Sequence, residues 1–368
     1  MSVSGVLARA DGDCLAAAGL FARALGERGV PYQVRVGRFG ERLGDEDVDE
    51  NADATVGIGL DPTADTHLPA ATAPASALAF DVGQELDASP DPVLALAGVV
   101  AAGYRPGAGE SAHLLEAARA SGVERRPGVG VPTEDLADGL AHTTLAHAPY
   151  SGEREAAQAA LAELGLPAEL DDGALRAVAS EFALAVAGDG SATDRAAEAV
   201  ERALRPHAVP GDAPADAPFA TVEGYADVLG AVARERPGVG VALALGHDAA
   251  DGALSAWRDH AARAHAVLRE GTTGRYDGLF ALRTEAAPVE TVARLLRDFR
   301  SPEPIALVVS ERAAAAAATE PLDVGAAMDE AAATVGGTGG GTPVRGYARF
   351  DSETDTTEFL SAFREARA

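Results

Sequence analysis

The chain has 368 residues, of which 57 are acidic and 30 basic, giving a formal net charge of −27 at pH 7. Hydrophobic residues make up 47% of it and recur with helical and strand periodicity, which excludes a disordered acidic polymer and predicts a folded protein of two domains. A single cysteine excludes a disulfide framework and a cysteine-based metal cluster.

Every basic residue is arginine, and an acidic, alanine-rich chain without lysine is typical of proteins from salt-accumulating cells. At molar salt the Debye length is about 3 Å, so repulsion between this chain and phosphate groups is largely screened. Counterion release is weakened as well, and the net charge therefore neither favours nor excludes DNA as a partner. The sequence shows no signal peptide and no apolar run of membrane-spanning length, so we expect a cytoplasmic protein without a membrane partner.

The first 25 residues predict a strand, an acidic loop and a helix. An apolar run from Val3 to Ala8 leads into an Asp-Gly turn at Asp11 and Gly12, and small apolar residues then recur at helical spacing. Such a βα unit opens an α/β domain and places its loop at the carboxyl end of the sheet, where ligands of these folds bind.

Two further strands and a polar segment are expected next. The run 30–38 alternates like a half-buried strand, 41–54 reads as an acidic loop, and 54–60 reads as another short strand. Asp65 and His67 follow in a polar stretch, which fits either part of a ligand site or a solvated loop.

Helices dominate the middle of the chain. Residues 74–104 predict two helices separated by a Pro-Asp-Pro turn, and 132–205 read as helical throughout. His142 and His147 lie five residues apart, but no third ligand is close in sequence, so we interpret them as solvated or capping histidines.

A Pro-, Gly- and Asp-rich stretch ending at residue 217 predicts the main domain boundary. A long helix over 249–270 is expected to connect to the last domain. For that domain we predict, in order, a strand (278–283), a helix (289–299), a strand (304–310), a helix, a Gly-rich loop and a strand (343–350).

The segment Leu7 to Gly12 resembles the first motif of the DHH phosphoesterase superfamily, of which the RecJ exonucleases are one branch. Family members read His-x-Asp-x-Asp-Gly before a helix of small residues. Here the histidine is Leu7 and the first aspartate is Arg9, whereas Asp11 and Gly12 are retained. The resemblance implies an α/β fold with a DHH-type parallel-sheet domain and a smaller α/β DHH-associated C-terminal domain.

On that basis we expect four segments. Residues 1–125 would form the DHH-like α/β domain and 126–210 a helical insert or continuation of it. Residues 217–275 would be connector helices, and 276–368 the DHH-associated C-terminal domain.

The resemblance also implies a metal site, because DHH enzymes hold two divalent ions to activate water. The expected ligands are Asp11, Asp65 and His67, with Mn²⁺ or Mg²⁺ as the cofactor if any activity survives. The aspartate that closes the family's second motif falls on Ile58 or Gly59, with Asp61 beyond it. Arg9 would place a permanent cation inside the site and repel a metal ion, so we expect the site to be incomplete.

Two features of the last domain resemble the family's phosphate-binding positions. Ser310 and Arg312 match a Ser-x-Arg motif, in which the guanidinium fork suits phosphate. The run Gly339, Gly340, Gly341 and Thr342 matches Gly-Gly-Gly-His with threonine in place of histidine. The glycines are predicted to form a loop whose backbone approaches a phosphate or terminal nucleotide.

Three functions remain open from the sequence. The first is a non-catalytic RecJ-like protein of DNA replication or repair that binds single-stranded nucleic acid or the replication proteins MCM and GINS. The second is an active exonuclease or small-nucleotide phosphodiesterase with ligands rebuilt from Asp11, Asp13, Asp61, Asp65 and His67. The third is a nucleotide sensor that uses only the Gly-rich run and Arg312.

Overall fold

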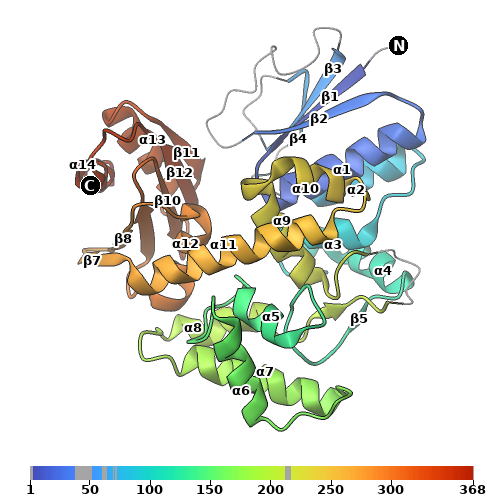
Figure 1. Cartoon of the computed structure of the whole chain (residues 1–368). Helices are drawn as coiled ribbons and strands as arrows, with labels where there is room; N and C mark the ends of the chain where they lie inside the picture. Colours follow the sequence, from blue (N-terminus) through green and yellow to red (C-terminus); the bar gives the residue numbers. More distant parts are fainter. Residues whose placement is uncertain are drawn as a thin grey trace. The chain divides into compact units, whose positions relative to one another are not determined.

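The computed structural model describes residues 3–37, 52–59, 64–68, 70, 73–211 and 217–367. It divides into two compact units (Figure 1). Unit 1 comprises residues 1–139, 166–179 and 203–259, and unit 2 comprises 140–165, 180–202 and 260–368. These limits differ from the predicted segment boundaries: 217–259, expected to be connector helices, belong to the same unit as the first sheet.

Unit 1 is built on a four-stranded parallel sheet in the order β2-β1-β3-β4. The predicted strand–loop–helix start is confirmed, since β1 leads directly into α1 (Figure 1). The strands are β1 (Val3–Arg9), β2 (Tyr32–Gly37), β3 (Ala52–Ile58) and β4 (Thr66–Leu68). Within the described residues no helix separates β3 from β4.

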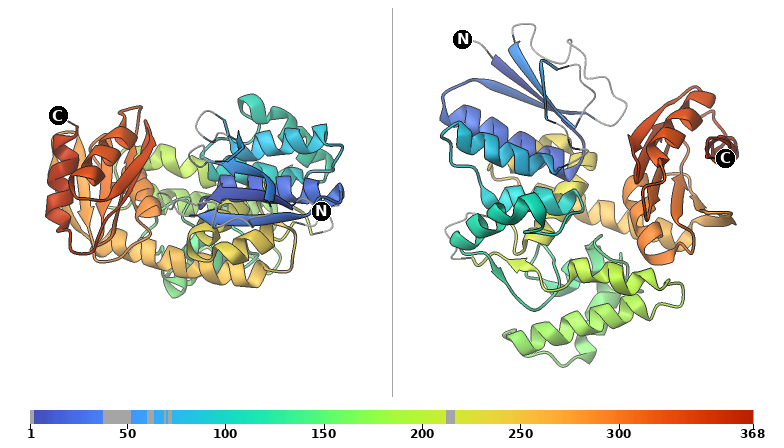
Figure 2. Two further views of the ribbon diagram at one scale, coloured as in Figure 1. Left: turned by 90° about the horizontal axis from the view of Figure 1, so that it is seen from above. Right: turned by 180° about the vertical axis from the view of Figure 1, so that it is seen from behind.

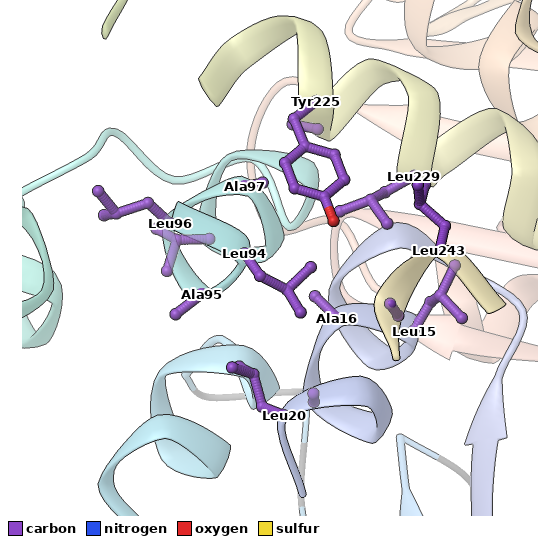
Figure 3. Close-up of a cluster of buried hydrophobic side chains, with 14 of the residues drawn as sticks. Leu15, Ala16, Leu20, Leu94, Ala95, Leu96, Ala97, Tyr225, Leu229 and Leu243 are labelled. Atoms are coloured by element: carbon purple, nitrogen blue, oxygen red, sulfur yellow. The ribbon is translucent and has the colours of Figure 1, made fainter. Parts of the chain in front are cut away.

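Helices of unit 1 pack into one apolar core that joins segments far apart in sequence. Figure 3 shows Leu15 of α1, Leu94 of α3, Leu229 of α9 and Leu243 of α10 converging in it. The helices are α1 (Gly12–Glu27), α2 (Ala75–Glu85), α3 (Pro92–Ala101), α4 (Ala112–Ala120), α9 (Val222–Glu235) and α10 (Pro237–Ala244), with a 3₁₀ turn at Gly109–Ser111. About half of their buried residues are alanine or glycine, which lets the helices approach closely.

Unit 2 contains a six-stranded mixed sheet in the order β11-β12-β10-β9-β8-β7. Its strands are β7 (Thr272–Tyr276), β8 (Leu279–Arg283), β9 (Ile305–Val309), β10 (Ala313–Ala318), β11 (Thr338–Thr342) and β12 (Arg345–Arg349). Helices α13 (Val324–Thr334) and α14 (Thr356–Glu365) lie beside the sheet (Figure 2). Their buried side chains form one cluster with those of the sheet. Helix α12 (Val289–Leu295), followed by the π-helical turn η4 (Leu296–Arg300), packs against β9 and β10.

Three strands of this sheet, β7, β10 and β11, contradict the prediction. Between the strand 304–310 and the Gly-rich run the prediction has only a helix, whereas the segment directly after Ser310 is a run of alanines, the best helix former. It is instead the strand β10, which lies between β12 and β9. Helices α12 and α13 both pack on β10, and this burial overrides the helix propensity of alanine. The edge strand β7 was also missed.

The remaining elements complete the chain. They are β5 (Glu124–Arg125), α5 (Leu136–His142), α6 (Arg154–Glu163), α7 (Asp172–Ala187), α8 (Arg195–Ala199), the 3₁₀ turn Val200–Ala203, β6 (His207–Ala208) and α11 (Ala250–Glu270). Helices α5, α7 and α11 each run from one unit into the other. In the part of the chain that the structure describes, no helix is both long and apolar enough to cross a membrane.

Candidate functional site

The strand order of unit 1 marks where a ligand would bind. β2 and β3 lie on opposite sides of β1, so the topological switch point falls between β1 and β3, at their carboxyl ends. The loop after β1 holds Asp11, and Gly59 follows β3 with φ at +67°. A side chain at Gly59 would meet Cys14 Sγ at 2.4 Å, so the cysteine side chain packs directly against the glycine at the switch point.

Asp11 is engaged on both carboxylate oxygens. Its Oδ1 accepts a hydrogen bond from the Cys14 backbone amide at 2.9 Å and so caps helix α1. Its Oδ2 accepts one from Arg9 Nε at 2.5 Å. Burial opposes ionisation of Asp11, but Arg9, the Cys14 amide and Arg234 outweigh it and hold the pKa of the carboxyl below its ordinary value. The cation predicted from Arg9 therefore lies against the retained aspartate.

Asp13 is a structural carboxylate that joins two helices. It is buried, and its two oxygens accept the backbone amides of Ala75 at 2.8 Å and Ser76 at 2.9 Å, at the start of α2. Burial and the neighbouring charge of Asp11 raise the pKa of Asp13 to about 6, against the lowering effect of these hydrogen bonds. Its role was not predicted, because the partner amides lie 62 and 63 residues away.

Asp65 and His67 do not join Asp11. The Asp65 carboxylate is exposed and accepts the Thr55 amide and hydroxyl at 2.9 and 3.0 Å, which lowers its pKa. Thr55 pairs with Gly5, four residues before Arg9, so Asp65 lies about 13 Å along the sheet from the acidic loop. His67 belongs to β4 and pairs with Gly57.

The donor set does not fit a pair of divalent ions. One oxygen of Asp11 accepts a hydrogen bond from a guanidinium, and the other caps a helix. Both oxygens of Asp13 accept hydrogen bonds from backbone amides. No group of three or more histidine, cysteine or acidic side chains in the described residues is arranged to hold a metal ion. Asp61, the remaining aspartate of the rebuilt-site hypothesis, lies outside those residues.

The Ser310–Arg312 motif closes a hairpin rather than ending an isolated strand. Ser310 is buried, and both its amide and its hydroxyl donate to the carbonyl of Ala313 at 2.8 Å, in the turn between β9 and β10. Arg312 is exposed and donates to Ser352 Oγ at 3.3 Å. Of the two, only Arg312 presents its polar group to solvent, so Ser310 is not available to a phosphate as the motif predicted.

The predicted Gly-rich loop is wrong, because Thr338–Thr342 form the edge strand β11. Its glycines allow α13 to lie directly on the strand: a side chain at Gly339 would meet the Met328 carbonyl oxygen at 2.3 Å. A side chain at Gly341, whose φ is +150°, would meet the Arg345 carbonyl oxygen at 2.1 Å. Thr342 Oγ1 accepts the amide of Arg345 at 3.2 Å in the turn to β12. Packing therefore accounts for Gly339, Gly341 and Thr342, and Gly340 lies between the two glycines on the same strand.

The interpretation of His147 from the sequence is also wrong. His147 is neither solvated nor capping: it is buried, and its Nδ1 lies 3.0 Å from Nδ1 of His265 on α11. The two rings stack with centroids 5.1 Å apart. No sequence signal connects them, because 118 residues intervene. We refer to these two residues as the histidine pair.

The hydrogen bonds around the histidine pair fix both tautomers. The Thr143 carbonyl can only accept, so His265 Nε2 carries the proton and its Nδ1 accepts from His147. His147 Nε2 then accepts from Arg300 at 3.2 Å. Burial is the largest effect that lowers the pKa of both rings, that of His265 to about 3, and Arg269 adds to it for both. Both imidazoles are therefore neutral.

Comparisons with known proteins agree with this architecture. Residues 271–365 match the family model described as "Uncharacterized protein rrnAC1427, C-terminal domain". The protein rrnAC1427 of Haloarcula marismortui is 50% identical over 359 residues, covering 97% of this chain and 91% of that protein. The chain belongs to the rrnAC1427 family.

Two solved structures show which fold this rrnAC1427-family protein has. CDC45 from Entamoeba histolytica superposes with a TM-score of 0.62 at 8% identity, over 100% of this chain and 95% of that one. The exonuclease RecJ bound to manganese superposes with a TM-score of 0.51 at 16% identity, over 99% and 90%. The predicted RecJ-like DHH fold is confirmed, with its parallel-sheet N-terminal part and separate C-terminal sheet.

Proposed function

We propose that this protein is a non-catalytic RecJ-like member of the DHH superfamily that acts as a nucleic-acid-binding or replisome scaffold. The observation that carries the proposal is the contact between Arg9 Nε and Asp11 Oδ2 at the switch point of the first sheet. A guanidinium occupies the position at which a divalent ion would need carboxylate oxygens, and the next carboxylate, Asp13, caps a helix.

The two structural neighbours support different halves of the proposal. RecJ, in the structure named above, is an exonuclease with bound manganese, whereas this chain has Leu7 and Arg9 in the first-motif positions of histidine and aspartate. CDC45 supports a role alongside replication proteins, for which MCM and GINS are the partners to test. The lysine-free acidic composition favours a salt-rich cytoplasm as the place where it acts.

The decisive experiment measures nucleotide release from end-labelled single-stranded DNA with and without manganese. We expect no manganese-dependent release from the wild-type protein, and no difference between it and Asp11→Ala. Release that requires manganese and disappears in Asp11→Ala would instead establish an exonuclease with a rebuilt site.

A gain-of-ligand variant sharpens the test. Leu7→His combined with Arg9→Asp restores two of the family's ligands beside Asp11, and calorimetry should detect manganese binding that the wild-type protein lacks. Recovery of GINS or MCM with tagged protein from its own cells is the expected positive result for the scaffold role. Failure to recover either partner, together with no binding to single-stranded DNA, would contradict it.

A further inference from the structure

The two-stranded sheet of unit 1 carries three exposed arginines close together. Strands β5 and β6 are antiparallel, and backbone hydrogen bonds extend the ladder beyond them. Arg125 ends β5, Arg126 follows it, and Arg205 lies two residues before β6. All three are exposed, and Arg125 Nε donates to the Arg205 carbonyl oxygen at 3.1 Å. We call Arg125, Arg126 and Arg205 the arginine patch.

The positive charge of the patch exceeds the negative charge paired with it. Arg126 donates to Glu124 at 3.1 Å, and the two side chains are 51% and 61% exposed, so solvent screens this pair. Neither Arg125 nor Arg205 forms an ion pair with any residue that the structure describes. In a chain with 57 acidic and 30 basic residues, two adjacent guanidiniums without a carboxylate partner are not expected from composition.

Arg205 has a backbone conformation that its residue type disfavours. Its φ is +53°, in the left-handed region. Among the non-glycine residues that the structure describes, Asp87 and Asp323 share this conformation, which a short polar side chain tolerates better than arginine does. Glycine would adopt it without strain. Strained residues cluster at binding sites, so the conformation points to a role for the Arg205 guanidinium itself.

A phosphodiester backbone is the ligand that fits the patch best. The guanidinium fork donates two parallel hydrogen bonds to a phosphate. A protein partner would need an apolar centre to its interface, but the large hydrophobic side chains that are exposed among the described residues all lie outside 124–130 and 203–208. Interfaces with nucleic acid are more polar and much more positively charged, as this surface is.

We propose that the arginine patch binds the phosphates of a nucleic-acid backbone, with Arg125 and Arg205 as the primary contacts and Arg126 as an additional one. The inference rests on the proposed nucleic-acid-binding function and assigns it a surface in unit 1, whereas Arg312 lies in unit 2. At molar salt the Debye length is about 3 Å. Repulsion between the net charge of −27 and phosphates is then screened, but direct contacts of about 2.8 Å persist.

The test measures binding of a fluorescent single-stranded oligo-dT and of a fluorescent duplex of equal length by anisotropy, from about 0.1 M to molar salt. Arg125→Ala and Arg205→Ala should each weaken binding. Each should also lower the slope of log affinity against log salt by about 0.7 for the single strand or about 0.9 for the duplex. Glu124→Gln should strengthen binding, because it releases Arg126 from its ion pair. The ligand that binds more tightly identifies the form of the backbone.

Arg205→Gly separates binding from folding. Because glycine relieves the left-handed strain, this variant should resist guanidinium better than Arg205→Ala while binding as weakly. The fluorescence of Trp257, which is buried in the core of unit 1, reports the unfolding. If Arg205→Gly binds like the wild type but unfolds more easily than Arg205→Ala, the Arg205 side chain is structural and the inference is overturned.

Arg28→Ala is the matched control. Arg28 is an arginine of the same unit that is 49% exposed, lies at the C-terminal end of α1 and donates to the Leu86 carbonyl oxygen at 2.6 Å. Its replacement should leave affinity and salt slope unchanged. An equal loss of affinity in Arg28→Ala and Arg125→Ala would mean that binding follows overall charge and not the patch.

The outcomes separate this inference from the proposed function. If the wild type binds nucleic acid and Arg312→Ala weakens binding while the patch variants do not, nucleic-acid binding stands and the patch is wrong. If neither the single strand nor the duplex binds, the inference is overturned, and recovery of MCM or GINS still tests the scaffold role by itself. If polyglutamate binds through the patch and neither nucleic acid does, the patch is a site for acidic protein segments and the inference is overturned.

Discussion

Each unit buries ionisable side chains at joints between its elements, and two of these joints should respond oppositely to pH: the carboxylate of Asp13 in unit 1 and the imidazoles of the histidine pair in unit 2. In unit 1, Asp13 connects the starts of α1 and α2 through backbone amides. In unit 2, the histidine pair connects the turn 143–152 to α11, and arginines complete the contact. We therefore expect acid to act on the two units in opposite directions.

The largest expected effect is acid destabilisation of unit 2. Both rings of the histidine pair have folded-state pKa values below the ordinary 6.5, so the unfolded chain binds more protons as the pH falls below that value. The stabilisation from the two neutral rings is present in full above pH 6.5. Below that pH the free energy of unfolding should fall by about 1.4 kcal/mol per pH unit for each histidine. The groups facing the pair are His142, Arg269, Arg294 and Arg300, all of which disfavour protonation.

Hydrogen exchange of unit 2 peptides between pH 7 and 4.5 checks this prediction. His147→Gln with His265→Gln should flatten the pH dependence by the contribution of both rings. His113→Gln is the control, because His113 is half-exposed and bonds Asp81 at 2.7 Å. An unchanged slope in the double variant would show that the pair does not control acid sensitivity.

Asp13 should give unit 1 the opposite response. Its folded-state pKa is about 6 and its ordinary value 3.8, so between these values the folded form holds a proton that the unfolded chain has lost. The free energy of unfolding should therefore rise as the pH falls from about 6 to 4, by at most about 3 kcal/mol. Asp13→Asn should abolish this rise.

The single tryptophan makes the measurement specific. Trp257 is buried in the core of unit 1 and donates to Asp227 at 2.8 Å, so its fluorescence during guanidinium unfolding reports on this unit. If the wild type and Asp13→Asn show the same pH dependence by this signal, Asp13 is ionised throughout the range and its pKa is not raised.

Local patterns predicted the parts of the fold whose partners are near in sequence. The strand 3–8, the acidic turn and the helix after it follow from periodicity and capping residues, and the structure has β1, Asp11 as N-cap, and α1. The resemblance of Leu7–Gly12 to a DHH motif added the fold, which the comparisons confirm. The motif also predicted a cation at this site from Arg9, whereas its contact with Asp11 is a finding of the structure.

What could not be predicted depends on distant partners. His147 meets His265 across 118 residues, and Asp13 meets α2 across 62, so neither pairing leaves a sequence signal. The alanine run of β10 and the glycine run of β11 were assigned from propensity, as helix and loop. Both are strands because α12 and α13 must pack closely on them.

The glycine run gives a prediction of intermediate size. Gly339→Ala would place a methyl group 2.3 Å from the Met328 carbonyl oxygen, and relief requires α13 to move off β11. We expect a loss of about 1–3 kcal/mol in the free energy of unfolding of unit 2. Gly190→Ala is the control, because no atom lies within 4 Å of its added Cβ. Equal stability of the two variants in guanidinium unfolding would show that the packing of α13 on β11 does not require glycine at position 339.

The smallest effect concerns the charge pair at the switch point. Arg9 and Asp11 are 31% and 17% exposed, so solvent screens part of their attraction, and Arg9→Ala should cost about 1 kcal/mol or less at pH 7. Because Arg9 helps hold the pKa of Asp11 below its ordinary value, the wild-type advantage should be present above pH 4 and vanish as the carboxyl becomes protonated below it. Guanidinium unfolding at pH 7 and pH 3, followed by Trp257 fluorescence, measures both values. A cost near 3 kcal/mol that persists at pH 3 would mean that the Arg9 side chain acts through packing, and that the cation at the switch point is structural rather than a replacement for metal charge.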